Sequence, residues 1–362
     1  MNFLNIYPNI KVQIQRGEGV YLFDVSNRRY IDLIAGIGVN ILGYHDPDCD
    51  RVLSDTEISP HFSNLFLHSL KEEIADILNK LCGTDKVFFT NSGTESNEAA
   101  IKFAWKVNPG KIVAFEGSFH GRSLGAYSLS HLFLHQNYPR INAHVEFASF
   151  NNADDLWKKG RDASTIIFEP IQGAGGVRVL KKEIYTALEE LQSNGIVIIS
   201  DEIQSGLGRT GDFLASGVLN FRPDIITLAK GLGGGIPLGA VCMKENIASS
   251  IHIGNHGTTM GGNLKALQLS QIVLKKLTTY LMEHIKEVEK NVVEEYKDRL
   301  GLRGKGLFIG FDVENGSEFA DKMVEKGYFV NIIKNNTVRL LPPYILKEED
   351  LRNFFKTAEE LI

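Results

Sequence analysis

The sequence predicts an α/β protein with a mostly parallel central sheet and a smaller α+β unit. From about residue 70, short apolar runs alternate with amphipathic helical patterns, and this alternation is typical of a parallel sheet covered by helices. After about residue 262, a long helical stretch leads into further strand patterns and a last helix. The chain has 362 residues, of which 43% are hydrophobic, so it is large enough for two or three structural units.

The beginning of the chain has a pattern of its own. Residues 11–33 alternate apolar and polar side chains, with breaks at glycines and at Asn27-Arg28, which predicts a small antiparallel meander. We expect this meander to pack with the C-terminal unit. The predicted organisation is an N-terminal segment, a large domain and a small domain, over residues 1–45, 46–262 and 263–362.

Five apolar runs provide the predicted strands of the large domain. They read KVFFT, KIVAFE, STIIFEP, IVIISDE and DIITLAK, with helical patterns such as ESNEAAIKFAWK and KKEIYTALEELQSNG between them. Parallel sheets bind ligands beyond the carboxyl ends of their strands. Distinctive residues follow each run directly, in TNSGTES, EGSFHGR, EPIQGAGG, DEIQSGLGRTG and KGLGGG. The sequence therefore predicts one binding site at one rim of the sheet.

Composition limits the partners. The net charge is −5, and acids and bases are interspersed without a basic run, which argues against nucleic acid or an anionic membrane as the main partner. Cys49, Cys82 and Cys242 form no C-x-x-C pair, so neither a disulfide framework nor a metal site is indicated. No apolar run has membrane-spanning length, and the N-terminus lacks the features of a signal peptide. We expect a cytoplasmic protein that binds small molecules.

Two features of the rim allow a structural and a functional interpretation. Lys230 stands between an apolar run and five glycines. It could end a helix, where a cation faces the negative end of the dipole, or serve as a nucleophile. The stretch NSGTES could place Ser92 or Thr94 as an ordinary helix N-cap, or use the start of the helix as a seat for an anion.

The stretch GLGRTG matches the dinucleotide-binding pattern G-x-G-x-x-G in form. That pattern should follow its strand directly and open a helix. Here the residues DEIQS intervene, and no acid stands at a convincing strand end further on. The stretch is therefore predicted to be a loop, with a nucleotide site as the alternative.

Charged residues beside apolar or glycine-rich sequence recur along the rim. Asp201 and Glu202 end an apolar run, and a buried carboxylate requires a cation or a donor. Arg122, Glu169 and Arg339 raise the same question, although each alone could be structural. A lysine nucleophile, an anion seat, a carboxylate for a ring nitrogen and arginines for carboxylates are together the parts that pyridoxal phosphate chemistry requires.

The chain resembles the class III (subgroup II) pyridoxal-phosphate aminotransferases, most closely the acetylornithine aminotransferases. The resemblance runs nearly end to end. It is carried by NSGTESNEAAIK, SFHGRS, FEPIQGAGG, DEIQSGLGRTG, LAKGLGGGIPLGA and HGTTMGGN, in this order. It implies the type I fold of pyridoxal-phosphate-dependent transferases, pyridoxal 5′-phosphate as cofactor and a homodimer with shared active sites.

The resemblance assigns five residues around the cofactor ring. Lys230 is the Schiff-base lysine, which also moves a proton as a free base. Asp201 keeps the ring nitrogen protonated, since an adjacent negative charge favours the cationic form. Gln204 bonds the ring oxygen O3′. Phe119 stacks on one face of the ring, and Ile203 packs against the other.

The same resemblance assigns the phosphate site to two subunits. Gly93 and Thr94 hold the phosphate from the subunit that carries the lysine. Thr259 reaches it from the neighbouring subunit, and Thr258 is the matching position on the substrate side. A complete site would therefore require a homodimer.

Two arginines and one glutamate are implied for the substrates. Arg122 matches the arginine for the α-carboxylate of acetylornithine, and Arg339 matches the arginine for the α-carboxylate of glutamate and 2-oxoglutarate. Planar guanidinium groups suit bidentate binding of carboxylates. Glu169 resembles a gate that pairs with Arg339 during the first half-reaction and then swings away.

The expected reaction transfers the terminal amino group of N2-acetyl-L-ornithine to 2-oxoglutarate, giving N-acetyl-L-glutamate 5-semialdehyde and L-glutamate in arginine biosynthesis. Ile37 stands where ornithine aminotransferases typically carry tyrosine, which favours the acylated substrate. Ala174 departs from the family pattern, where an acid is frequent. The alternatives are carrier-linked lysine, succinylornithine, ornithine or 4-aminobutyrate as amino donor, a nicotinamide-dependent oxidoreductase, and a catalytically silent binding protein.

Overall fold

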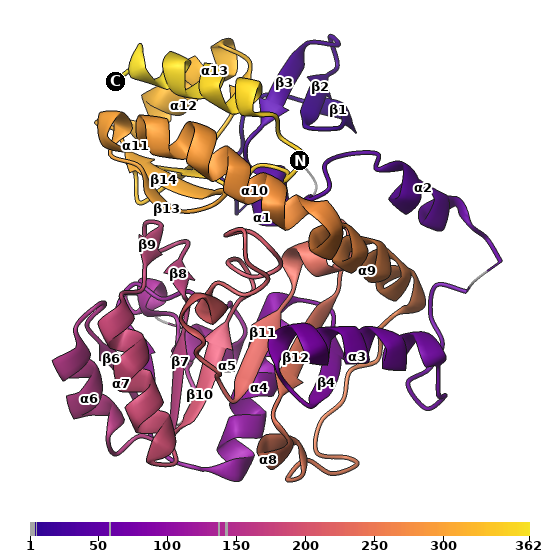
Figure 1. Cartoon of the computed structure of the whole chain (residues 1–362), viewed down its shortest axis with the longest axis vertical. Helices are drawn as coiled ribbons and strands as arrows, with labels where there is room; N and C mark the ends of the chain where they lie inside the picture. Colours follow the sequence, from indigo (N-terminus) through magenta and orange to yellow (C-terminus); the bar gives the residue numbers. More distant parts are fainter. Residues whose placement is uncertain (1–3, 5, 58, 137, 142–143) are drawn as a thin grey trace.

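A seven-stranded sheet forms the centre of the computed structural model, which describes residues 4, 6–57, 59–136, 138–141 and 144–362 (Figure 1). Its strands are, in spatial order, β4 (Lys86–Thr90), β12 (Gly239–Met243), β11 (Ile225–Leu228), β10 (Val197–Asp201), β7 (Thr165–Phe168), β5 (Ile112–Phe115) and β6 (Val145–Ala148). The pairs from β11 to β6 are parallel. The prediction of a mostly parallel sheet is confirmed.

The strands of this sheet are buried on both faces. All four residues of β5, β7 and β11 are buried, as are all five of β10. These continuous apolar runs are expected of strands covered by helices on both sides. The helices between residues 47 and 248 are α2 (Pro47–Ser54), α3 (Ser69–Cys82), α4 (Gly93–Val107), α5 (Leu124–Ser128), α6 (Ala153–Gly160), α7 (Lys182–Ser193) and α8 (Glu245–Ala248).

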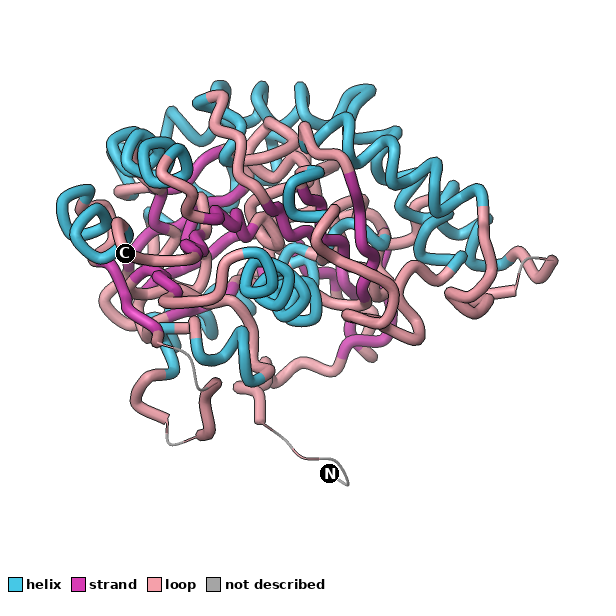
Figure 2. Tube along the Cα trace, turned by 90° about the horizontal axis from the view of Figure 1, so that it is seen from below, coloured by secondary structure: helices cyan, strands magenta, loops and turns pink. Residues whose placement is uncertain are grey.

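The C-terminal part carries a second sheet. Its strands lie in the order β13 (Arg303–Lys305), β14 (Phe308–Asp312), β17 (Thr337–Leu340) and β16 (Asn331–Ile333). Helices α12 (Gly316–Glu325) and α13 (Glu348–Glu359) accompany them. In Figure 1 these elements occupy the upper half and the central sheet the lower half. Figure 2 shows the strands in the interior and the helices around them.

The predicted long helical stretch after residue 262 is present as consecutive helical segments. These are α9 (Leu264–Lys276), α10 (Met282–Val288) and α11 (Glu294–Leu300), joined by the π-helical turns η4 (Leu277–Leu281) and η5 (Glu289–Val293). Leu267, Leu274 and Leu281 are among its fully buried side chains. The stretch therefore stays continuous because its apolar side packs into the main core.

The N-terminal meander pairs with a strand from the far end of the chain. β1 (Ile14–Glu18), β2 (Tyr21–Asp24) and β3 (Arg29–Asp32) are antiparallel, as predicted. β15 (Tyr328–Phe329) adds to β3 in parallel. The first and last parts of the chain thus share one four-stranded sheet.

Two predictions about the central sheet require correction. The sheet contains β6 and β12, which the sequence patterns did not reveal, and β12 runs antiparallel to both β11 and β4. The interpretation of Lys230 as the end of a helix is wrong. Lys230 follows strand β11 and begins a short 3₁₀ turn, η3 (Lys230–Gly233), because the preceding β-branched run is buried as a strand.

Candidate active site

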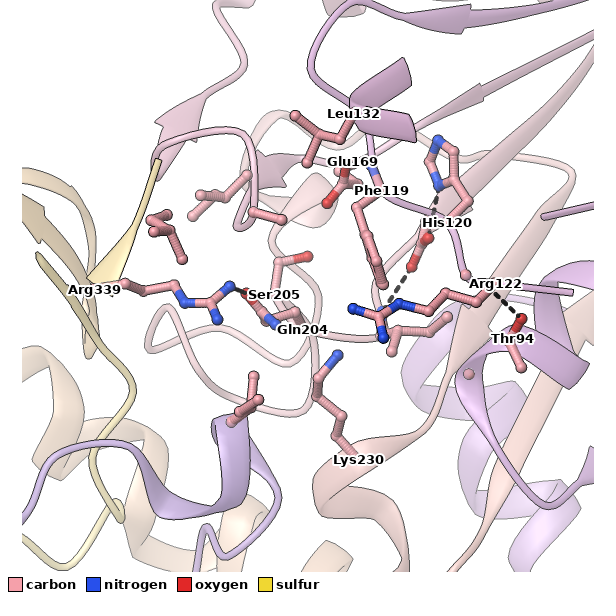
Figure 3. A pocket seen from close by; sticks show the side chains of 18 of the residues that line it. Thr94, Phe119, His120, Arg122, Leu132, Glu169, Gln204, Ser205, Lys230 and Arg339 are labelled. Carbon is pink, nitrogen blue, oxygen red and sulfur yellow. Dashed lines mark hydrogen bonds and ion pairs between the residues drawn. The ribbon is translucent and has the colours of Figure 1, made fainter. Parts of the chain in front are cut away.

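A cavity of about 620 Å³ lies beyond the carboxyl ends of five strands. Figure 3 shows side chains from several parts of the chain pointing into it. Residues that follow β4, β5, β7, β10 and β11 line it, as the rim prediction requires. The predicted site residues on its wall are Gly93, Thr94, Phe119, Arg122, Glu169, Asp201, Ile203, Gln204, Lys230 and Arg339, together with Ile37 and Ala174.

Lys230 carries a free amine in this cavity. Its φ of 46° is a strained value for a residue with a side chain, and such strain is often found at functional sites. Among the described residues, its Nζ has no hydrogen-bond or ion-pair partner. Burial lowers the pKa of Lys230 to about 8, although the negative charge of Asp201 acts against this shift. A substantial share of the amine is therefore neutral, and nucleophilic, near physiological pH.

The Asp201 carboxylate is buried and fixed by three donors. Its Oδ2 lies 2.8 Å from Nδ1 of His120 and 2.7 Å from Nδ2 of Asn97, while its Oδ1 accepts the backbone N–H of Ile203 at 3.1 Å. The side chain is 5% exposed. Asn97 is itself fixed, because its Oδ1 accepts the hydroxyl of Thr227 at 2.8 Å. Asp201 is thus a preorganised acceptor that faces the cavity.

The start of helix α4 has an ordinary N-cap and also lines the cavity. Ser92 is the N-cap, and its side chain accepts the N–H of Glu95 at 3.3 Å. Gly93 and Thr94 nevertheless line the cavity, and the first N–H groups of a helix lack partners within the helix. A side chain at Gly93 would place its Cβ 2.7 Å from Ile203 Cγ2. The close approach of backbone to cavity therefore depends on glycine here.

Phe119 and Arg122 come from the loop after β5. The Arg122 guanidinium carbon lies 6.0 Å from the ring centroid of Phe119 and 5.6 Å from that of Phe133. The backbone N–H of Arg122 donates to Thr94 Oγ1 at 3.2 Å, which ties this loop to helix α4. Arg122 is exposed and extends toward the centre of the cavity (Figure 3). Arg122 can therefore bind an anionic group of a ligand that enters the cavity.

The implied gate between Glu169 and Arg339 is not formed in the described structure. Glu169 Oε2 accepts the backbone N–H of Phe119 at 3.0 Å. Arg339 instead donates from Nε and Nη2 to Asn331, and from Nη1 to Gln204 Oε1 at 3.1 Å. In this conformation Glu169 and Arg339 each bond to closer neutral groups, so the gate remains a prediction.

Gln204 bonds to Arg339 and keeps a donor for the expected contact with the cofactor ring. Its Oε1 faces Arg339, so its amide nitrogen is the group left to donate to a ring oxygen.

Burial raises the pKa of Glu169 to about 7, with Asp201 adding to the shift and His120 opposing it. Burial also lowers the pKa of Arg339 to about 10. Arg339 still carries its charge at neutral pH.

Thr258 and Thr259 lie outside the cavity of their own chain. Thr258 Oγ1 accepts Nδ2 of Asn91 at 3.0 Å, and its carbonyl accepts Nδ2 of Asn64 at 2.8 Å. Thr259 is exposed. Within one chain, these two positions are therefore not brought together with the other predicted site residues.

Sequence reasoning missed several residues that shape the site. His120 and Asn97 hold Asp201, Asn331 holds Arg339, and Lys334 lines the cavity, where its Nζ donates to the carbonyl of Gly175 at 2.8 Å. His120 stood inside the quoted stretch SFHGRS and could have been noticed. Asn331 and Lys334 carried no signal, because only strand pairing places them beside the cavity.

A family model described as aminotransferase class-III matches residues 5–362. The chain belongs to the class III aminotransferases. This family uses pyridoxal 5′-phosphate. An acetylornithine aminotransferase of Aquifex aeolicus is 37% identical over 99% of this chain and 99% of that protein. One of Archaeoglobus fulgidus is 36% identical over 97% of this chain and 95% of that protein.

Solved structures of aminotransferases share the fold. The ornithine aminotransferase of Toxoplasma gondii superposes with a TM-score of 0.93 at 24% identity, covering 100% of this chain and 94% of that one. The N-acetylornithine aminotransferase of Stenotrophomonas maltophilia has a TM-score of 0.82 at 28% identity, covering 98% and 96%. The type I fold of pyridoxal-phosphate-dependent transferases is therefore confirmed. GLGRTG lies in a loop, as predicted, and opens no helix.

The residues around the cavity fit the chemistry of this cofactor. An unpaired lysine amine, a fixed carboxylate and a helix start for a phosphate face one space. Phe119 and Ile203 supply apolar surface on the same wall. The space that Gly93 leaves open beside Ile203 would be filled by a single added methyl group.

Proposed function

We propose that this aminotransferase moves the terminal amino group of N2-acetyl-L-ornithine to 2-oxoglutarate. The products are N-acetyl-L-glutamate 5-semialdehyde and L-glutamate, in a step of arginine biosynthesis. The observation that carries the proposal is the presence of two carboxylate-binding arginines, Arg122 and Arg339, in one cavity with Lys230. Figure 3 shows the two guanidinium groups approaching Lys230 from different sides. The names of the relatives described above support the same substrate.

The two arginines explain how one site can take two differently shaped substrates. An acetylornithine whose α-carboxylate binds Arg122 would present its distal amine to Lys230. A glutamate whose α-carboxylate binds Arg339 would present its α-amine instead, with the second carboxylate toward Arg122. Guanidinium groups orient carboxylates through paired hydrogen bonds, so each arginine selects a different amine of its substrate.

Pyridoxal phosphate, when bound, supplies the electron sink that stabilises a carbanion. Asp201 would keep a proton on the ring nitrogen, because His120, Asn97 and the N–H of Ile203 hold the carboxylate in place. The start of α4 at Gly93 and Thr94 would hold the phosphate. Lys230 would accept and return the proton at the substrate carbon, for which a pKa of about 8 is suitable.

Ornithine is the second candidate amino donor, since ornithine aminotransferases share the fold closely. Ile37 favours the acylated substrate over ornithine. It lies on the cavity wall and is 44% exposed, so it offers apolar surface where an acetyl group can pack. A free α-ammonium group would gain nothing from this contact.

The test is to load the purified protein with pyridoxal phosphate and follow the absorbance of the bound cofactor after adding one amine without an acceptor. N-acetylornithine is expected to convert the cofactor to its amine form more efficiently than ornithine, succinylornithine or 4-aminobutyrate. Equal or better kcat/KM with any of those amines would refute the substrate assignment. Lys230→Ala serves as the control that binds cofactor without converting it.

We also propose that the active enzyme is a homodimer with shared sites, in which Thr259 reaches the phosphate of the partner. Supporting this, Thr259 is exposed. The exposed apolar side chains Leu65, Phe66, Leu67 and Met260 belong to two segments that are joined by the hydrogen bond from Asn64 to the carbonyl of Thr258. An exposed apolar surface of this kind usually marks an interface.

Mixing inactive Lys230→Ala with impaired Thr259→Ala should restore activity, because each mixed dimer contains one intact site. No restoration after subunit exchange would contradict shared sites.

The division into domains remains a proposal as well. We assign residues 46–262 to a large cofactor-binding domain and residues 263–362, with the N-terminal segment 1–45, to a small domain. The pairing of β15 with β3 supports placing the N-terminal segment with the C-terminal unit.

None of the helices in the described ranges has the length and hydropathy needed to cross a membrane. We propose a cytoplasmic location, which fractionation of the source cells would test.

A further inference from the structure

Arg339 is held in place by amide oxygens. Asn331 lies directly opposite Arg339 in the ladder between β16 and β17. Its Oδ1 accepts hydrogen bonds from Nε at 3.0 Å and from Nη2 at 2.6 Å. Gln204 Oε1 accepts from Nη1 at 3.1 Å. The guanidinium group is therefore fixed from two sides, by a neighbouring strand and by the loop after β10.

The chemistry of the guanidinium determines how these amides point. It carries five N–H donors and no acceptor, so each amide must turn its oxygen toward it. Three of the five donors are used in the bonds to Asn331 and Gln204, which leaves two for a ligand. Arg339 is 5% exposed. Because both acceptors are neutral, the buried cation lacks a contacting counter-ion and remains available to a carboxylate.

Glu169 does not contact Arg339 in this arrangement, although its negative charge acts on the guanidinium group from a distance. Its Oε2 is used by the backbone N–H of Phe119, and the described residues include no ion pair between Glu169 and Arg339. Glu169 is also buried, which favours its uncharged form. In this conformation Arg339 is thus positioned by neutral hydrogen-bond acceptors.

We propose that Asn331 is the positioning residue that holds Arg339 ready for the α-carboxylate of glutamate and 2-oxoglutarate. This inference rests on the proposed function, in which the α-carboxylate of acetylornithine binds Arg122 instead. It follows that Asn331 matters for the glutamate half-reaction and not for the acetylornithine half-reaction.

The test measures the two half-reactions separately, with L-glutamate or N-acetylornithine as the single amine added to the cofactor-loaded enzyme. Asn331→Leu removes the acceptor at similar size. Asn331→Ala removes the acceptor and leaves a smaller side chain without adding charge. Both variants are expected to raise KM for glutamate about tenfold or more, and to leave KM for acetylornithine within about twofold. Asn336→Leu is the matched control, since Asn336 is exposed in the turn of the same hairpin.

An unchanged KM for glutamate in both Asn331 variants, or an equal rise for both amines, would overturn the proposal. Asn331→Ala decides the question alone if the leucine variant does not fold or loses the cofactor band. Failure of the proposed function has a different signature. In that case the wild-type enzyme reacts with glutamate but not with acetylornithine, and the KM for glutamate still measures the role of Asn331 against the Asn336→Leu control.

Discussion

Nδ1 of His120 lies 2.8 Å from Oδ2 of Asp201, and both side chains are buried. The same oxygen also accepts Nδ2 of Asn97. Two donors from separate elements, the loop after β5 and helix α4, therefore converge on one carboxylate oxygen. This arrangement fixes the direction in which Asp201 faces the cavity.

His120→Phe is expected to weaken cofactor binding. The substitution removes a hydrogen bond to a charged group in a buried site, which costs about 1.5–3 kcal/mol, or roughly 10- to 100-fold in affinity. The dissociation constant of pyridoxal phosphate should be measured by titrating cofactor-free protein and following the absorbance band. Asn97→Leu should act in the same direction, because it removes the other donor. Full affinity in both variants would show that Asp201 does not need these partners.

The capture of pyridoxal phosphate by Lys230 should depend on pH. Burial lowers the pKa of Lys230 to about 8, and only the neutral amine can attack the aldehyde. The second-order rate of capture by cofactor-free protein is therefore expected to rise about tenfold per pH unit below pH 8 and to level off above it. Stopped-flow absorbance between pH 6 and pH 10 would show this. A rate that kept rising toward pH 10 would mean an amine with an ordinary pKa.

Gly93→Ala is expected to reduce cofactor affinity without unfolding the protein. The new Cβ would lie 2.7 Å from Ile203 Cγ2, and such overpacking costs about 1–3 kcal/mol. Gly217→Ala is the matched control, because among the side chains that the structure describes its Cβ would meet Leu214 Cβ at 3.7 Å, an ordinary contact. Combining Gly93→Ala with Ile203→Ala, which removes Cγ2, should recover part of the lost affinity. If the double variant binds no better than Gly93→Ala, the contact with Ile203 is not the cause.

The sequence predicted the elements better than it predicted the contacts at the site. Strands β5, β7, β10 and β11 were evident because buried parallel strands read as continuous apolar runs. β12 was missed because its residues follow glycines and its antiparallel direction depends on pairing with β4 and β11. The partners of Arg339 were missed for a related reason, since Asn331 meets it only through strand register.

Motifs carried the identity of the site residues but not their hydrogen bonds. The stretches after the strands placed Lys230, Asp201 and Arg122 on one cavity wall, as expected. The pairing of Glu169 with Arg339 was expected from the resemblance and is absent here, because it depends on which of several acceptors lies nearest. Distances of this kind are set by tertiary packing, and a motif does not encode them.

Ile37→Tyr is expected to shift substrate preference from acetylornithine toward ornithine. Ile37 lies on the cavity wall with φ of 64°. This φ already strains the backbone with isoleucine, so tyrosine adds no further backbone strain. The hydroxyl would offer a hydrogen bond to a free α-ammonium group and take apolar surface from the acetyl group. The ratio of kcat/KM for acetylornithine to that for ornithine should fall about tenfold, or roughly 1.4 kcal/mol. Ile37→Leu is the matched control and should leave the ratio within about twofold. An unchanged ratio in the tyrosine variant would mean that the acetyl group binds away from Ile37, and Lys334 on the same cavity wall would then be the next position to substitute.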